Sequence, residues 1–183
     1  MLPNRRALLT LLAALVFAAL AVGVSACGYS SNSKSVVEGE TLKLGELKYI
    51  VTFSRYLNPS DTEDAAYLAG QPEAPKDTNY FGVFFEVQNE SDEPQTLPAT
   101  VTITDAEDNE YKALKSESIY ALPFEGEVEA EEQIPVLNSP AQQGPIEGSV
   151  AIFLLPEEVS SNRPLILHIE GSEGEKGEVT LDL

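Results

Sequence analysis

Few side chains in this sequence have the chemistry that catalysis needs. His168 is the only histidine and Cys27 is the only cysteine, so a nucleophile–histidine–acid arrangement could use only one imidazole. The sequence contains no HExxH, CxxC or glycine-rich phosphate-binding motif. His168 alternates with Leu167 and Ile169, which is the pattern of a residue on the face of a β-strand. We therefore expect no catalytic residues and no enzyme activity.

Carboxylates are the second group that could carry chemistry. Asp105, Glu107, Asp108 and Glu110 lie in one short segment, and loops rich in oxygen ligands bind calcium. The spacing lacks the central glycine and the twelfth-position glutamate of an EF-hand, so Asp105 and Asp108 are only weak calcium candidates. A hairpin turn explains the same residues, because Asp and Asn side chains bond to the backbone of turns. We expect no metal and no cofactor other than a lipid.

Three tyrosines define a candidate partner loop. Tyr56, Tyr67 and Tyr80 flank or occupy the long segment 55–79, which lies between two strand-like patterns. Long loops in compact domains are usually functional or disordered, and tyrosine is common at binding surfaces. The alternative is that each ring packs against the edge of the domain. A capping box and a glycine stop within the segment predict a short helix near 61–69.

The elements that would position these residues are β-strands. Apolar residues recur with a period of two, which is typical of strands buried on one face. Segments with this pattern are 46–53, 80–88, 101–104, 150–155, 165–170 and 179–183. Polar turns separate them, and no alternation of strands with helices is present. The pattern predicts one all-β domain over 41–183, an antiparallel sandwich of about seven to nine strands.

The N-terminal region has the layout of an export signal. Arg5 and Arg6 precede an apolar run over 7–24, and small residues follow before Cys27. Val24, Ser25, Ala26 and Cys27 resemble the lipobox of bacterial lipoproteins. The resemblance implies that residues 1–26 are a cleaved signal peptide and that Cys27 carries diacylglyceryl and acyl chains. The domain would then be anchored to the cell membrane on its extracytoplasmic side.

Two other interpretations of the N-terminal region remain open. The apolar run is about as long as the shortest membrane-spanning helix, so an uncleaved anchor is one alternative. A plain secreted protein is the other. Under the lipoprotein interpretation, the serine-rich residues 27–40 are a flexible tether between lipid and domain. All three interpretations place the domain outside the cytoplasm, because the basic end stays inside.

The charge of the chain limits its partners. The sequence has 30 acidic and 11 basic residues, and two of the basic residues fall within 1–26. The mature chain would carry a net charge of about −21. This charge argues against binding to nucleic acid, which requires Lys/Arg patches. It is explained by solubility, or by attraction to a basic partner or divalent cations.

One segment suggests a family. Residues 80–97, YFGVFFEVQNESDEPQTL, resemble the core of the telokin-like, immunoglobulin-like domains found after bacterial lipoprotein signals. Residues 101–105 and 148–156 follow in the order expected for that family. The resemblance implies an extracytoplasmic sandwich with no catalytic residues, in a family whose members mostly have no assigned function.

The expected function is therefore binding. We expect a non-enzymatic interaction module at the cell envelope that contacts a protein or another extracytoplasmic component through the 55–79 loop. A structural spacer without specific recognition is an alternative from a different class, and a calcium-dependent binding domain is a third.

Overall fold

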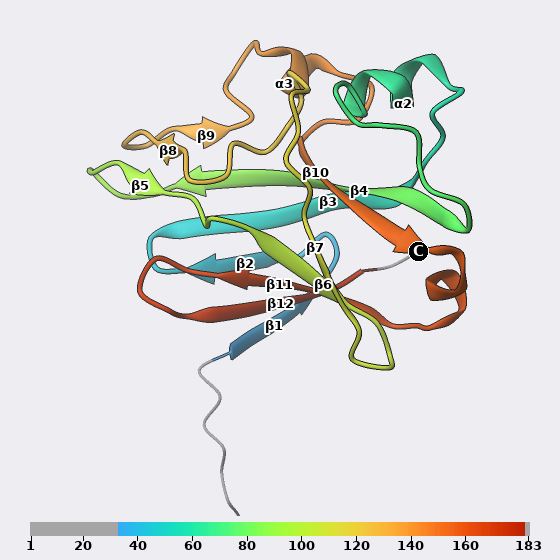
Figure 1. The fold of residues 1–183 in the computed structure, drawn as a ribbon. Helices are drawn as coiled ribbons and strands as arrows, with labels where there is room; N and C mark the ends of the chain where they lie inside the picture. The colour runs from blue at the N-terminus through green and yellow to red at the C-terminus, as the bar shows by residue number, and fades with distance from the viewer. Residues whose placement is uncertain (1–32, 182–183) are drawn as a thin grey trace, which may run out of the picture. The chain divides into compact units, whose positions relative to one another are not determined.

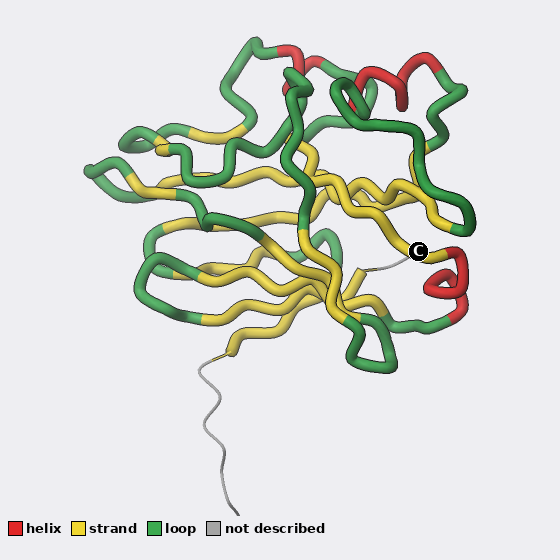
Figure 2. The backbone as a smooth tube through the Cα atoms, in the orientation of Figure 1, coloured by secondary structure: helices red, strands yellow, loops and turns green. Residues whose placement is uncertain are grey.

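The computed structural model describes residues 33–181, which form a domain of β-strands with short helices (Figures 1 and 2). Three of the twelve strands have only two residues. In chain order the elements are β1 (Ser33–Val37), β2 (Thr41–Leu44), β3 (Leu47–Leu57), α2 (Thr62–Tyr67), β4 (Thr78–Asn89), β5 (Gln95–Thr96), β6 (Val101–Thr104), β7 (Glu110–Lys112), β8 (Glu127–Val128), β9 (Gln133–Ile134), α3 (Pro140–Gln143), β10 (Ser149–Pro156), η1 (Glu157–Ser161), β11 (Leu165–Glu170) and β12 (Lys176–Leu181).

Two main sheets face each other, which confirms the predicted all-β antiparallel sandwich. Sheet A has the strand order β1-β12-β11-β6-β7, and sheet B has the order β10-β4-β3-β2 with β9 paired to the end of β4. A small ribbon of β5 and β8 stands apart from both. All neighbouring named strands pair antiparallel except β1, which runs parallel to β12.

The main core lies between the two sheets. Alternate residues of each strand point inward, so the period of two in the sequence becomes one apolar face on each sheet. Phe81, Phe85 and Phe153 of sheet B are fully buried, as are Leu165 and Leu167 of sheet A. Burial of each such side chain contributes on the order of 1.5–3 kcal/mol to the free energy of folding.

Sheet B is also buried on its outer face, which the predicted half-buried strands did not include. All residues from Tyr80 to Phe85 in β4 are buried. Figure 2 shows loops and two short helices lying over this face, on the side of sheet B away from sheet A. They enclose a second core, whose buried members are Leu57, Tyr67, Leu68, Tyr80, Phe84, Val150 and Ile152.

Helix α2 confirms the expected helix, with narrower bounds. Its N-cap is Asp61, whose side chain accepts hydrogen bonds from the backbone N–H groups of Glu63 and Asp64. Gly70, with φ of 82°, follows the helix as its expected stop. The buried Asp64 carboxylate pairs with both terminal nitrogens of Arg55 on β3, at 2.8 and 2.5 Å. This bidentate contact fixes the helix to the sheet.

The predicted tether over 27–40 is too long, because its second half contains strand β1. Ser33 to Val37 pair with Lys176 to Thr180, and Val36 packs against the main core. The residues of β1 do not show the alternation of a strand in the sequence. They form a strand because they pair with β12, which lies far away along the chain. The signal peptide, Val24, Ser25, Ala26 and Cys27 lie outside the described residues. Within 33–181 no helix has the length and apolar character needed to cross a membrane.

Two tyrosines of the second core allow a matched test of its packing. The Tyr80 hydroxyl donates a hydrogen bond to the Pro72 carbonyl at 2.7 Å. The buried Tyr67 hydroxyl lies near the backbone of Ile146 but makes no hydrogen bond of good geometry with the described residues. We predict that Tyr80→Phe lowers the free energy of unfolding by about 1 kcal/mol, and that Tyr67→Phe leaves it unchanged or raises it. Urea denaturation measures both. An equal loss in the two variants would contradict this description of the second core.

Candidate functional site

The candidate partner loop does not present its tyrosines to solvent. Tyr67 and Tyr80 are only 1% and 3% exposed, because both belong to the second core. Tyr56 is half-buried against the main core, with its ring centroid 5.1 Å from that of Phe81. The prediction that these rings form a binding surface is therefore corrected. Of the three rings, that of Tyr67 covers the apolar outer face of sheet B, to which Tyr80 itself belongs.

The weak calcium candidates lie in the turn between β6 and β7. The Asp105 side chain is 4% exposed, and its oxygens accept hydrogen bonds from the backbone of Glu107 and Asn109, the Asn109 amide and the Tyr111 hydroxyl. Asp108 is exposed and has φ of 62°, as a tight turn requires. Within 33–181 no three His, Cys, Asp or Glu residues are grouped as metal ligands would be. The Asp105 carboxylate thus stabilises the β6–β7 hairpin by accepting these hydrogen bonds.

Electrostatics support this role of Asp105. Burial alone would raise the pKa of the Asp105 carboxyl, but hydrogen bonds from Asn109 and Glu107 outweigh it and lower the pKa below its ordinary value. The Tyr111 hydroxyl, which donates to Asp105, has its pKa raised to about 12. Burial is the larger cause, and the hydrogen bond to the Asp105 carboxylate is the second. The carboxylate is therefore stabilised in its charged form by protein donors.

The outer face of sheet A carries an open polar hollow of about 420 Å³. Four neighbouring strands contribute to it, because the outward positions of a strand with a period of two are the polar ones. The lining residues are Thr100, Thr102, Thr104, Glu110, Lys112, His168, Ile169, Glu170, Lys176, Gly177 and Glu178. Cations and carboxylates alternate around a central strip of threonine and histidine. The hollow therefore offers hydrogen bonds and charges of both signs.

His168 lies at the centre of the hollow, on β11. Its Nε2 is 2.8 Å from Thr104 Oγ1, and its Nδ1 is 3.9 Å from Glu178 Oε1. The order hydroxyl, imidazole, carboxylate is that of a hydrolytic triad. In a triad the imidazole is hydrogen-bonded to the carboxylate, whereas 3.9 Å between Nδ1 and Oε1 is beyond hydrogen-bond distance. The three side chains therefore present polar atoms to the hollow without the hydrogen-bonded chain of a triad.

Sequence reasoning placed His168 correctly on a strand face but missed the hollow. The alternating threonines at 100, 102 and 104 and the outward Glu178 are visible as polar positions in the sequence. The alternation in the sequence does not show which strands become neighbours in the sheet. Only the pairing of β11 with both β6 and β12 brings His168 next to Thr104 and Glu178.

Comparison with known proteins shows the fold and no family. No family model matches the chain, and no curated protein matches it. Among solved structures, the chain is similar to an uncharacterized β-sandwich protein from Clostridium difficile 630, with 16% identity, TM-score 0.50, and coverage of 81% of this chain and 93% of that one. It is also similar to the yjhA protein from Bacillus subtilis, with 14% identity, TM-score 0.53, and coverage of 80% and 99%.

A third similar structure is larger. It is ycdA from Bacillus subtilis, described as a "putative lipoprotein", with 10% identity and TM-score 0.50. The match covers 80% of this chain but 39% of ycdA. At these identities the similarity establishes a β-sandwich architecture, and it leaves the function open.

Replacement of Asp105 tests its role in the hairpin. A carboxyl with a lowered folded pKa stabilises the protein above its unfolded pKa of about 3.9, and this stability is lost as the pH falls through the folded value. We predict that Asp105→Asn lowers the free energy of unfolding at pH 7 by about 1–3 kcal/mol and flattens its decline below pH 4.

The exposed Asp108 provides the matched control, since Asn also tolerates positive φ. Asp108→Asn should change neither quantity by more than about 0.5 kcal/mol. The role assigned to Asp105 is wrong if the two variants show the same thermal stability from pH 2 to 7.

Proposed function

We propose that the protein is a lipid-anchored, non-enzymatic recognition domain on the outer side of a bacterial membrane, and that the outer face of sheet A binds its partner. One observation carries the proposal. The outer face of sheet B is covered over β10 and the first half of β4 by α2 and parts of the segment 113–148, and its uncovered part has a hollow of about 160 Å³. The outer face of sheet A has no such layer and holds the polar hollow of about 420 Å³. A sandwich that covers part of one sheet and leaves the other uncovered has a defined surface for recognition.

The N-terminal sequence supports the anchor. Basic residues, an apolar run and the lipobox-like residues Val24 to Cys27 occur in the order that lipoprotein processing requires. A diacylglyceryl group supplies two chains, and two chains anchor stably where one is marginal. The similarity in fold to ycdA, the "putative lipoprotein", agrees with this proposal.

The composition of the hollow supports a polar partner. Lys112 and Lys176 lie in it with Glu110, Glu170 and Glu178, so charges of both signs are present on a chain that is otherwise strongly acidic. Paired opposite charges give specificity and orientation at an interface more than raw affinity. An extracytoplasmic protein or envelope component with a polar, mixed-charge surface fits this face. A spacer without recognition remains the alternative.

Loss of the lipid tests the anchor. Cys27→Ser should move the protein from the membrane fraction to the soluble fraction, because the variant offers no thiol for the lipid. Cell fractionation with immunoblotting measures the distribution, and Ser31→Ala in the same region is the control that should stay with membranes. Retention of Cys27→Ser in the membrane fraction would show that the anchor is not a lipid on this residue.

Charge reversal in the hollow tests the recognition face. Proteins that co-purify with the anchored protein are compared between the native chain and the double variant Thr102→Glu/Lys112→Glu. We expect at least a tenfold loss of a specific partner, because the change places two carboxylates among Glu110, Glu170 and Glu178. The control is Thr62→Glu/Lys115→Glu, which alters the same residue types outside the hollow. An identical set of partners for all three proteins would favour the spacer.

A further inference from the structure

The position of β1 shortens the connection between Cys27 and the folded domain. The first described residue is Ser33, six positions after Cys27, and from there the chain is paired in sheet A. Six residues span at most about 20 Å when fully extended. A tether that lasted to Thr41 would span up to about 50 Å. The strand therefore leaves six residue steps, rather than fourteen, between position 27 and the paired part of the chain.

The parallel pairing of β1 also decides which end of the domain is held. Ser33 lies opposite Lys176, where β12 begins, and the β11–β12 turn (171–175) is adjacent. Glu175 of that turn approaches Gly45, so the β2–β3 turn lies at the same end. We call this the anchor end.

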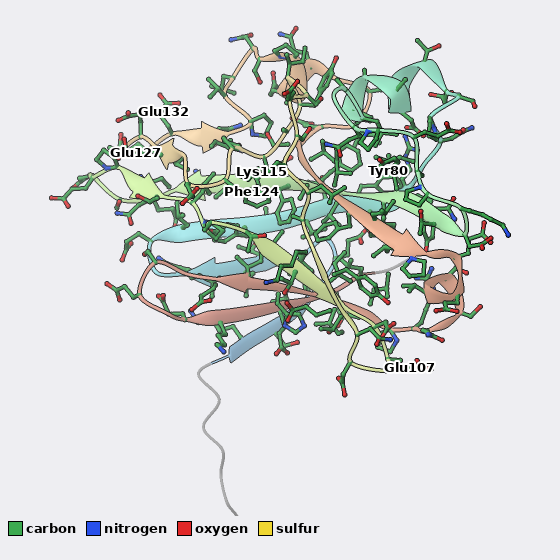
Figure 3. All side chains as sticks on the ribbon, in the orientation of Figure 1. Tyr80, Glu107, Lys115, Phe124, Glu127 and Glu132 are labelled. Atoms are coloured by element: carbon green, nitrogen blue, oxygen red, sulfur yellow. The ribbon has the colours of Figure 1, made fainter. Side chains whose placement is uncertain are left out.

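The opposite end of the domain is the far end. Val37 lies opposite Thr180 on β12, which lies opposite Ile166 on β11, which in turn lies opposite Thr104 on β6. Thr104 is the last residue of β6, so the β6–β7 turn is at this end of the domain. In Figure 3, Glu107 of that turn lies at the opposite end of the domain from Glu127 and Glu132. Six residues of β12 separate the two ends, which corresponds to about 20 Å.

Strand β1 is fixed by contacts to both sheets. Glu38 donates its backbone N–H to Thr180 at 2.9 Å, and the Lys34 ammonium donates to the Lys43 carbonyl on β2 at 2.6 Å. The outward N–H of Val37 is bonded to the Glu40 carboxylate at 3.1 Å. Because Val36 also packs into the main core, the tether cannot lengthen unless these contacts break.

Charge then favours one orientation over an anionic lipid surface. The anchor end carries Glu173 and Glu175 together with Lys34, Lys43 and Lys176, whereas Glu107, Asp108 and Glu158 lie near the far end. An anionic surface repels the acidic far end within about a Debye length, and the lysines of the anchor end offset its glutamates. Since only the anchor end is tethered, it stays near the lipid and the far end turns away.

We infer that β1 sets the height and orientation of the domain on the membrane, with the β11–β12 turn facing the lipid and the β6–β7 turn pointing away. This inference rests on the proposed lipid anchor at Cys27. The strands of sheet A then run away from the membrane, and the polar hollow opens to the side. A partner that projects from the same membrane reaches it laterally.

Energy transfer to labelled lipid tests this orientation. The full chain is expressed with Ser172→Cys at the anchor end or Glu107→Cys at the far end, and each introduced cysteine carries the same donor dye. The lipidated proteins are reconstituted into phosphatidylglycerol-containing vesicles with an acceptor on the lipid headgroups. We expect transfer from position 172 to be at least twofold more efficient than from position 107. Equal transfer, or more transfer from 107, would overturn the inference.

Failure of the anchor itself gives a different result. If residues 1–26 are removed without lipidation, neither labelled protein floats with the vesicles, and the inference falls with its premise. If they remain as an uncleaved anchor, a Cys27→Ser protein floats as well, and the premise is refuted in the same way. If both proteins float and transfer equally, the anchor stands and only the orientation is refuted.

Variants that lengthen the tether test the role of β1 directly. Val36→Asp should release β1 and lower transfer from position 172, whereas the control Val37→Asp alters a residue that is 50% exposed and should not. Twelve Gly/Ser residues inserted after Tyr29 lengthen the tether without touching β1, so this variant is informative even if Val36→Asp fails to fold. The insertion should also lower transfer from 172. Unchanged transfer in the insertion variant would refute the control of height by a short tether.

Discussion

The architecture depends on one constraint: where β10 meets the first half of β4, sheet B is apolar on both of its faces. In β4, inward residues such as Phe81 and Phe85 and outward residues such as Tyr80 and Phe84 are all buried. A sandwich of two sheets covers only one face of each sheet, and uncovered aromatic rings would cost on the order of 1.5–3 kcal/mol apiece. A third layer, built from α2 and the segment 113–148, is therefore required for stability (Figure 1).

The third layer also determines which edges and faces of the two sheets stay exposed. The segment 113–122 also closes the free edge of β10, because Leu114 and Leu122 donate to β10 carbonyls at 2.7 and 2.9 Å and Val150 donates back to Tyr120 at 2.7 Å. Closed edges limit strand-to-strand association between molecules. The long irregular segments of this protein are thus structural, and the outer face of sheet A is left without a covering layer.

Much of the fold follows from local pattern, and the rest from non-local contacts. Alternation predicted the main strands and the sandwich, and capping chemistry predicted α2. The same alternation cannot tell whether an outward Phe84 meets solvent or another layer, so Tyr67 and Tyr80 were assigned to a binding loop. Strand β1 was not predicted, because the contacts that order its Ser-Lys-Ser run are non-local and come from β12 and β2. The lipid on Cys27 remains a prediction from sequence.

Native-state hydrogen exchange tests the central claim that α2 is part of the folded core. The Leu68 amide, which donates to Asp64 at 3.0 Å, reports on the third layer, and the amides of β4 report on sheet B. If α2 is required to cover sheet B, Leu68 exchanges only through the same global unfolding as β4, with similar protection in rising denaturant. If Leu68 exchanges a hundredfold or more faster while β4 stays protected, α2 opens as an independent loop and the account is wrong.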